Sequence, residues 1–169
     1  KLCSATQLAV LGGLYAEKFR MENVFNETTV IFGSAYKGIP ISVATAIALA
    51  GTDRAGVRAV SDRKEAKTHG DTSSFLGEIK SGDKAVIVDD VITAGTAIRD
   101  AAALLRNAGA TLAGVMLGLD RRERGQGARS ATQEVAEELD VPVMSIIAID
   151  HIIEYLDAAA PARVAALRD

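Results

Sequence analysis

The stretch Ala85–Asp100, AVIVDDVITAGTAIRD, decides the fold class of this chain. It opens with an apolar, largely β-branched run, Ala85–Val88, whose lack of alternation is typical of a strand buried on both faces. Two adjacent carboxylates, Asp89 and Asp90, end the run, and a loop of small residues leads from them into a helical pattern. This order of strand, acid pair, small-residue loop and helix start predicts one ligand-binding unit.

The loop and helix start suit a phosphate, because free backbone N–H groups and the positive end of a helix attract anions. Gly95 allows the backbone to approach a ligand, and the hydroxyls of Thr93 and Thr96 add donors. An ordinary threonine cap would use the same atoms and is compatible with phosphate binding.

The acid pair admits two interpretations. Asp89 and Asp90 could be a helix cap with a solvated neighbour, or they could accept hydrogen bonds from sugar hydroxyls or hold a hydrated Mg²⁺. Adjacent residues of a strand point to opposite faces, so the two acids should have different roles unless the chain turns there. Together with the phosphate loop, the second interpretation predicts a site for a phosphorylated sugar.

The remaining chain alternates between helical and strand patterns. We expect helices over residues 5–20, 39–50, from the 93–97 loop to 107, 130–139 and 150–156, and strands over 28–32, 57–60, 84–88, 112–119 and 143–149. This alternation predicts a single α/β domain over 1–169 with a central, mainly parallel sheet and helices on both faces. Ligands of such sheets bind beyond the carboxyl ends of the strands, so the loops 33–38, 89–95 and 120–127 should converge.

Composition narrows the class of protein. Apolar residues make up 49% of the 169 residues and aromatic residues only 4%, which predicts an aliphatic core. The net charge of −3, with mixed signs, gives no indication of nucleic-acid or membrane-surface binding, and we expect neither partner. The only cysteine, Cys3, cannot form an internal disulfide, which favours a cytoplasmic protein.

Four segments resemble known enzymes. VIVDDVITAGTAIRDA resembles the motif with which type I phosphoribosyltransferases bind PRPP (5-phosphoribosyl 1-diphosphate). A narrower resemblance, to orotate phosphoribosyltransferases, lies in three further segments: FGSAYKGIPISVATAIAL, RKEAKTHGD and LDRRERGQG. The resemblance extends from about Gln7 to Leu156. It implies the type I phosphoribosyltransferase fold and Mg²⁺-dependent transfer of the phosphoribosyl group from PRPP to orotate, a step of pyrimidine biosynthesis.

The resemblance also implies a PRPP site. Asp89 and Asp90 would meet the ribose hydroxyls directly or through water and Mg²⁺, with no direct protein–metal bond, and act as catalytic residues. Lys37, which could otherwise be an ordinary solvated lysine, would be directed to the diphosphate. The full implied set is Tyr36, Lys37, Arg63, Lys64, Lys67, His69, Asp89, Asp90, Val91, Ile92, Thr93, Ala94, Gly95, Thr96 and Ala97.

Residues 61–80 are polar and lack periodicity, and so long a connector within a compact domain is often a functional lid. Its basic residues could also be a solvated charge run. The resemblance implies a mobile catalytic loop that closes over the active site of the other subunit of a homodimer. Lys67, assisted by His69 and Arg63, would then stabilise the leaving diphosphate.

Arg121 directly follows a predicted strand, and its guanidinium matches a carboxylate in a bidentate manner. The resemblance implies that Arg121 binds the carboxylate of orotate and that Thr93 also lies near the base. We expect Arg122 and Arg124 to face solvent, and His151 to be a surface or interface residue without a role in the site.

Members of the resembled family carry an N-terminal hood ahead of the helix that opens this sequence. We expect this hood to be incomplete here. Two other functions stay open: transfer to a different base, which should not need Arg121 or the RKEAKTHGD segment, and non-catalytic regulation by PRPP and nucleic acid, which should need a basic face.

Overall fold

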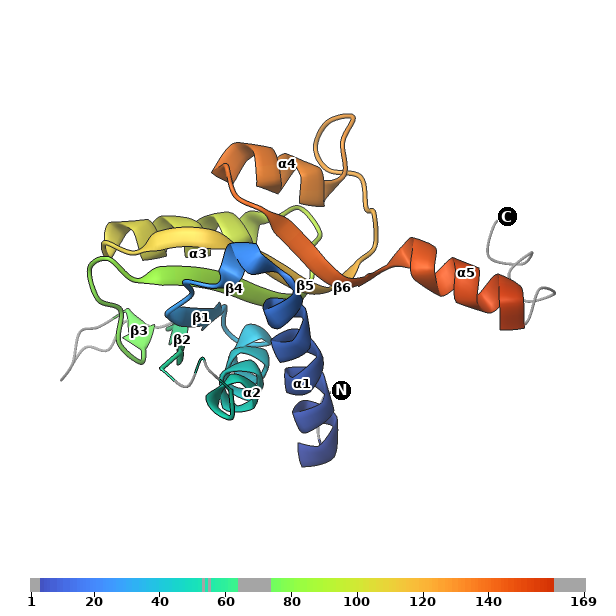
Figure 1. Cartoon of the computed structure of the whole chain (residues 1–169). Helices are drawn as coiled ribbons and strands as arrows, with labels where there is room; N and C mark the ends of the chain where they lie inside the picture. The colour runs from blue at the N-terminus through green and yellow to red at the C-terminus, as the bar shows by residue number, and fades with distance from the viewer. Residues whose placement is uncertain (1–3, 53, 55, 64–73, 160–169) are drawn as a thin grey trace.

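Six strands form one sheet in the order β3-β2-β1-β4-β5-β6 in the computed structural model, which describes residues 4–52, 54, 56–63 and 74–159 (Figure 1). Every neighbouring pair is parallel except β2 and β3, which are antiparallel. The strands are β1 (Val30–Gly33), β2 (Arg58–Asp62), β3 (Phe75–Leu76), β4 (Lys84–Val91), β5 (Thr111–Asp120) and β6 (Val143–Ala148).

Helices cover both faces of this sheet, as the sequence predicts (Figure 1). One face carries α1 and α2, the other carries α3 and α4, and α5 extends away from the end of β6. The helices are α1 (Ala5–Met21), α2 (Gly38–Ala50), α3 (Thr96–Asn107), α4 (Ala131–Leu139) and α5 (Ile149–Ala159), with a 3₁₀ turn η1 at Asn23–Phe25.

The central strand β4 joins two apolar clusters. Ala85 and Ile87 pack into the cluster beneath α3 and α4, whereas Val86 and Val88 pack into the cluster beneath α1 and α2. All four side chains are fully buried, which confirms the expectation of a strand covered on both faces. Because both faces are needed for burial, β4 holds its carboxyl end firmly in the middle of the sheet.

Local signals at the helix ends explain where several elements begin and stop. Ser4 and Ser130 each accept a hydrogen bond from the backbone of the third helical residue in a capping box, which the sequence predicts for Ser130 and Gln133. After α3 the chain turns at Gly109, whose φ of +83° is accessible to glycine, and Ala110 N–H donates to the carbonyl of Leu105.

Two features differ from the predicted elements. β4 continues to Val91 instead of ending at residue 88, so Asp89 and Asp90 lie within the strand. Part of the 61–80 segment forms β3, which pairs with Ser61 and Asp62 and leaves no periodic signal because it has only two residues. Among the described residues, no helix is both long and apolar enough to cross a bilayer.

Candidate active site

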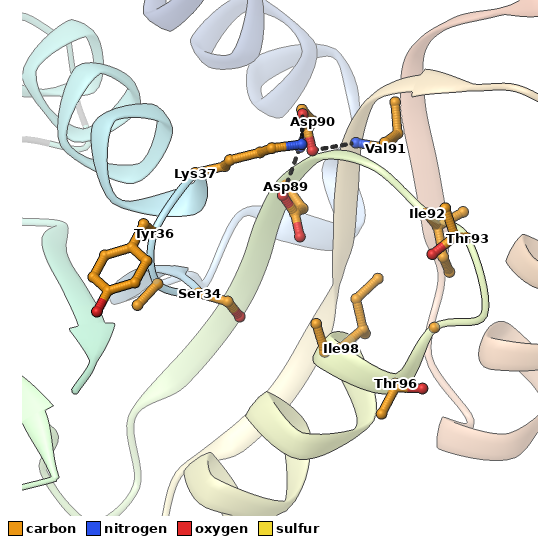
Figure 2. Close-up of a pocket in the computed structure, with 13 residues that line it drawn as sticks. Ser34, Tyr36, Lys37, Asp89, Asp90, Val91, Ile92, Thr93, Thr96 and Ile98 are labelled. Atoms are coloured by element: carbon orange, nitrogen blue, oxygen red, sulfur yellow. Dashed lines mark hydrogen bonds and ion pairs between the residues drawn. The ribbon is translucent and has the colours of Figure 1, made fainter. Parts of the chain in front are cut away.

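A cavity of about 580 Å³ lies at the carboxyl ends of β1 and β4 (Figure 2). Two of the three predicted loops form it, the one after β1 and the one between β4 and α3, whereas the third, 120–127, contributes no lining residue. Its size is in the range of small-molecule sites. The lining residues are Ser34, Ala35, Tyr36, Lys37, Asp89, Asp90, Val91, Ile92, Thr93, Gly95, Thr96, Ala97 and Ile98.

The two acids of the sequence motif line this cavity. The N–H of Asp90 donates to Oδ1 of Asp89 at 2.8 Å, and the N–H of Val91 donates to Oδ1 of Asp90 at 3.0 Å. Lys37 Nζ lies 3.2 Å from Oδ2 of Asp90 and joins the loop after β1 to the end of β4 (Figure 2). Each carboxylate is therefore oriented by the backbone directly after it.

The surroundings of the two acids shift their pKa values in opposite directions. Burial, followed by the neighbouring Asp90 carboxylate, raises the pKa of Asp89 to about 6, although the N–H of Asp90 opposes this shift. Partial burial also acts against ionisation of Asp90, but the hydrogen bond from Lys37 and the other donors outweigh it and lower the pKa of Asp90. Near neutral pH the cavity thus contains two acids of different proton affinity.

The start of α3 forms an anion cradle. Its N-cap, Gly95, has a φ of +76°, and none of the described side chains caps the first backbone N–H groups. Arg99 donates to the Ala94 carbonyl and pairs with Glu138 at 2.6 Å, which holds the loop from outside. A Cβ at position 95 would lie 2.6 Å from Val135, so this backbone requires glycine for both conformation and space.

The opposite wall is the loop between β1 and α2. A Cβ at Gly33 would lie 2.0 Å from the carbonyl oxygen of Gly38, so the loop closes tightly only without a side chain there. The Ala35 N–H donates to Oδ1 of Asp62 at 2.6 Å, which ties this loop to the end of β2. Lys37 extends from it with 76% of its side chain exposed.

Most residues of the predicted PRPP set that the structure describes line the cavity. Ala94 does not, and its carbonyl accepts a hydrogen bond from Arg99. Arg63 is not among the lining residues either: its Nε donates to the Phe75 carbonyl at 2.9 Å, at the base of the 61–80 segment. The other predicted residues of that segment, Lys64, Lys67 and His69, lie outside the described residues.

Arg121 follows β5 as predicted but does not line the cavity. Its Nη2 pairs with Glu123 at 2.9 Å, and its buried Nε has no hydrogen-bond partner among the described residues. Arg122 and Arg124 are exposed, as predicted. His151 is exposed too, and its Nδ1 accepts a hydrogen bond from the Ala148 N–H at the start of α5.

Sequence reasoning missed several residues that shape the site. Ser34, Ala35 and Ile98 line the cavity, and all three lie inside the quoted motifs, although only their neighbours were assigned to the PRPP set. Asp62 lies two residues after the predicted strand 57–60, and it supports the 33–38 loop without lining the cavity. The contacts of Arg99 leave no signal in the sequence, because they depend on how α3 and α4 pack.

Comparison with known proteins connects this geometry to a family. The family model of the phosphoribosyl transferase domain matches residues 6–146. The orotate phosphoribosyltransferase of Acinetobacter baumannii (strain ACICU) is 51% identical over 152 residues, which are 89% of this chain and 68% of that relative. The chain belongs to the orotate phosphoribosyltransferase family.

The fold of this chain is also similar to that of solved structures. The orotate phosphoribosyltransferase of Francisella tularensis matches with a TM-score of 0.80 and 32% identity, covering 93% of this chain and 74% of the other. That of Mycobacterium tuberculosis in complex with 5-phospho-alpha-D-ribosyl 1-diphosphate matches with a TM-score of 0.64 and 19% identity, covering 85% and 74%, which shows the fold alone. The type I phosphoribosyltransferase fold is therefore confirmed.

Proposed function

We propose that this member of the orotate phosphoribosyltransferase family carries out its transfer reaction in the cavity between the 33–38 loop and residues 89–98. The reaction moves the phosphoribosyl group of PRPP to N1 of orotate and releases diphosphate. One observation supports this location above others: the acid pair at the end of β4 lies beside the uncapped start of α3 in a single cavity. This places groups suited to ribose hydroxyls next to groups suited to phosphate.

The cavity offers suitable binding groups for each part of PRPP. The 5′-phosphate would bind the N–H groups and hydroxyls of residues 93–97, at the positive end of α3. The ribose hydroxyls would bind Asp89 and Asp90. Lys37 would leave Asp90 for the diphosphate, a change that its exposure permits.

The donors of the cavity fit Mg²⁺ held largely by substrate and water. Asp89 and Asp90 are its acids, and no cluster of three or more metal-ligating side chains occurs in the part of the chain that the structure describes. Mg²⁺ is commonly bound by one or two carboxylates together with substrate phosphates and waters. We propose that Asp89 and Asp90 would hold it through its water molecules and through PRPP, without a direct protein–metal bond, and that the ion would neutralise charge on the diphosphate.

The chemistry requires positioning and electrostatics. The bond from C1 of the ribose to the diphosphate oxygen breaks, a bond from C1 to N1 of orotate forms, and the proton of N1 passes to the departing diphosphate or to water. Positive charge develops on the ribose ring as the diphosphate leaves, and the carboxylates of Asp89 and Asp90 stabilise it. The cradle and the acids hold C1 in line with the base, so no covalent protein intermediate is needed.

Arg121 and Thr93 are our proposed contacts to orotate. Arg121 lies after β5, the strand next to β4, and it would exchange Glu123 for the carboxylate of orotate. Its unpartnered Nε supports this role, because a buried donor gains from a new acceptor. We further propose that Lys67, His69 and Arg63 of the 61–80 segment stabilise the diphosphate bound in the active site of the other subunit of a homodimer.

An apolar surface on α1 and α2 supports a homodimer. A groove of about 580 Å³ between these helices is lined by apolar side chains, and Val43 and Ile47 are exposed on it. The groove is close to the site, because α2 begins directly after Lys37 and contacts β2, the strand that leads into the 61–80 segment. Ile47→Glu should dissociate the dimer in light scattering after gel filtration, whereas Thr111→Glu, at an exposed position at the amino end of β5, should not.

The decisive experiment follows loss of orotate in the presence of PRPP and Mg²⁺, with uracil, guanine and adenine as parallel bases. We expect only orotate to react. Arg121→Ala should raise the KM for orotate at least about tenfold, since it removes a bidentate ion pair, and should leave PRPP binding intact. Arg122→Ala is the matched control. Binding of PRPP without any reaction of orotate would contradict the proposal.

The catalytic loop has a separate test. Lys67→Ala should lower turnover far more than the affinity for PRPP, because a lysine that meets the leaving group acts mainly in the transition state. Unchanged turnover would remove the assignment of the loop. The single Cys3 is consistent with our proposal that the protein works in the cytoplasm.

A further inference from the structure

Tyr15 of α1 reaches the acid pair from beneath the sheet. Its side chain is fully buried among the apolar residues of the α1 and α2 face, and its hydroxyl donates to the main-chain carbonyl of Asp89 at 2.7 Å. The two residues are 74 positions apart in sequence. Tyr15 does not line the cavity, so it has no direct access to a ligand there.

The carbonyl of Asp89 lies just beyond the point where the pairing of β1 with β4 ends. β1 pairs with β4 only as far as Gly33 and Val88, whereas β5 continues alongside β4 to Val91. From Asp89 onward, the described sheet therefore supports β4 on one side only. The hydroxyl of Tyr15 supplies a donor to the backbone in this part of the strand, which β1 does not support.

The hydrogen bond from Tyr15 to the Asp89 carbonyl also affects the N–H of Asp90. The C=O of Asp89 and the N–H of Asp90 belong to one planar peptide group, so fixing one end fixes the other. The same N–H donates to Oδ1 of Asp89 and orients its carboxylate. A hydrogen bond accepted by the carbonyl also polarises the peptide and strengthens its N–H as a donor.

The neighbouring strand leaves room for this contact. A Cβ at Gly118 of β5 would lie 3.0 Å from the hydroxyl oxygen of Tyr15 and 3.0 Å from the carbonyl oxygen of Asp90. Both distances are tighter than ordinary contact, so an alanine there would displace the hydroxyl or the Asp90 backbone. Gly118 thus leaves room for the Tyr15 hydroxyl and for the following peptide of the strand, Asp90–Val91.

We propose that Tyr15 is a positioning residue for the PRPP site: its hydroxyl fixes the Asp89–Asp90 peptide and so sets the aim of the acid pair. This inference rests on the proposed function of the cavity. Burial, followed by the charges of Asp89 and Asp90, raises the pKa of Tyr15 far above neutrality, so the hydroxyl keeps its proton and remains a donor.

The test compares Tyr15→Phe with Tyr155→Phe, the same chemical change on α5 where the side chain is 72% exposed. Tyr15→Phe should lower kcat/KM for PRPP by about tenfold, as expected from loss of one aligned hydrogen bond near the reacting ring. The KM for orotate should not change. The acid limb of the pH profile should move to higher pH, because a weaker N–H bond to Asp89 leaves its carboxylate more basic. Tyr155→Phe should behave like the wild type.

Two further measurements keep the outcome clear. Calorimetric titration with PRPP and Mg²⁺, which does not depend on turnover, should show weaker binding by Tyr15→Phe than by the wild type. If the wild type itself binds no PRPP, the result refutes the proposed function of the cavity instead. Gly118→Ala keeps the hydroxyl but displaces it, and should shift PRPP binding and the acid limb in the same directions. A Tyr15→Phe variant that loses thermal stability alone, or that weakens both substrates equally, would overturn the inference.

Discussion

The two ends of β4 carry carboxylates under opposite conditions. Asp83, directly before the strand, is buried and accepts hydrogen bonds from the Thr29 hydroxyl at 2.9 Å and the Lys80 N–H at 2.6 Å, and it also pairs with Arg58. Burial opposes its ionisation, but these donors outweigh burial and lower the pKa of Asp83. At the other end, Asp89 is also buried in part, yet its pKa is raised.

The difference shows how one strand can stabilise the fold at its start and provide a site at its end. At the start of β4, three groups are directed at one carboxylate and leave it little capacity for a ligand. At the end, two carboxylates compete for few donors, so a hydroxyl or cation from outside would be favourable. The first arrangement adds to folding stability, whereas the second costs stability and prepares binding.

The largest effect should follow from neutralising the binding end. Asp89→Asn keeps the shape of the side chain but removes the charge, and we expect kcat/KM for PRPP to fall by roughly 100- to 1000-fold. The folded state should be no less stable, and more stable above pH 6, because an acid with a raised pKa is costly to ionise. Steady-state kinetics and urea unfolding would test this, with the exposed Asp100→Asn as control.

The same substitution at the structural end should do the opposite. Asp83→Asn loses the pairing with Arg58 and one or more hydrogen bonds at a buried position, and should lower the free energy of unfolding by about 2–3 kcal/mol. Activity per folded molecule should remain near that of the wild type. A strong loss of PRPP binding in this variant would show that the two ends are not independent.

Acidification should affect function before folding. The pKa of Asp89 is about 6, so kcat/KM for PRPP should decrease by about tenfold per pH unit below that value as the carboxylate takes up a proton. The lowered pKa of Asp83 contributes stability above its unfolded-state pKa, and this stability is lost only as pH falls through the lower folded-state value. A pH profile of activity beside circular dichroism of the same samples separates the two transitions.

The smallest effect on folding stability should come from removing a single partner at each end. Thr29→Val deletes a hydroxyl that donates to Asp83 and accepts from the Lys84 N–H, and should lower the free energy of unfolding by about 1 kcal/mol. Lys37→Met removes an exposed ion pair and should leave stability unchanged. It should raise the pKa of Asp89, however, because the charge of Lys37 lowers that pKa, and so shift the acid limb of the activity profile upward. Thermal unfolding and kinetics of the pair would show whether this contrast holds.

Local patterns were sufficient for much of the fold. The apolar run before Asp89, the capping box at Ser130 and the glycine after α3 are short-range signals, and each predicted element was found close to its expected place. The end of β4 was misplaced because the two acids look like loop residues, while pairing with β5 keeps them in the strand. The two-residue β3 was missed because it exists only through its partner β2.

The sequence by itself determined the chemistry of the site: an acid pair, a glycine loop and a lysine loop, each directly after a strand. Their neighbours in the chain set these features, so they can be read along it. Only the tertiary structure decided that Tyr15 supports Asp89, that Asp62 holds the loop of Lys37, and that Arg121 turns to Glu123 instead of the cavity. Such contacts join residues through the packing of helices on the sheet or the turn of a loop, and their geometry has no counterpart in residue order.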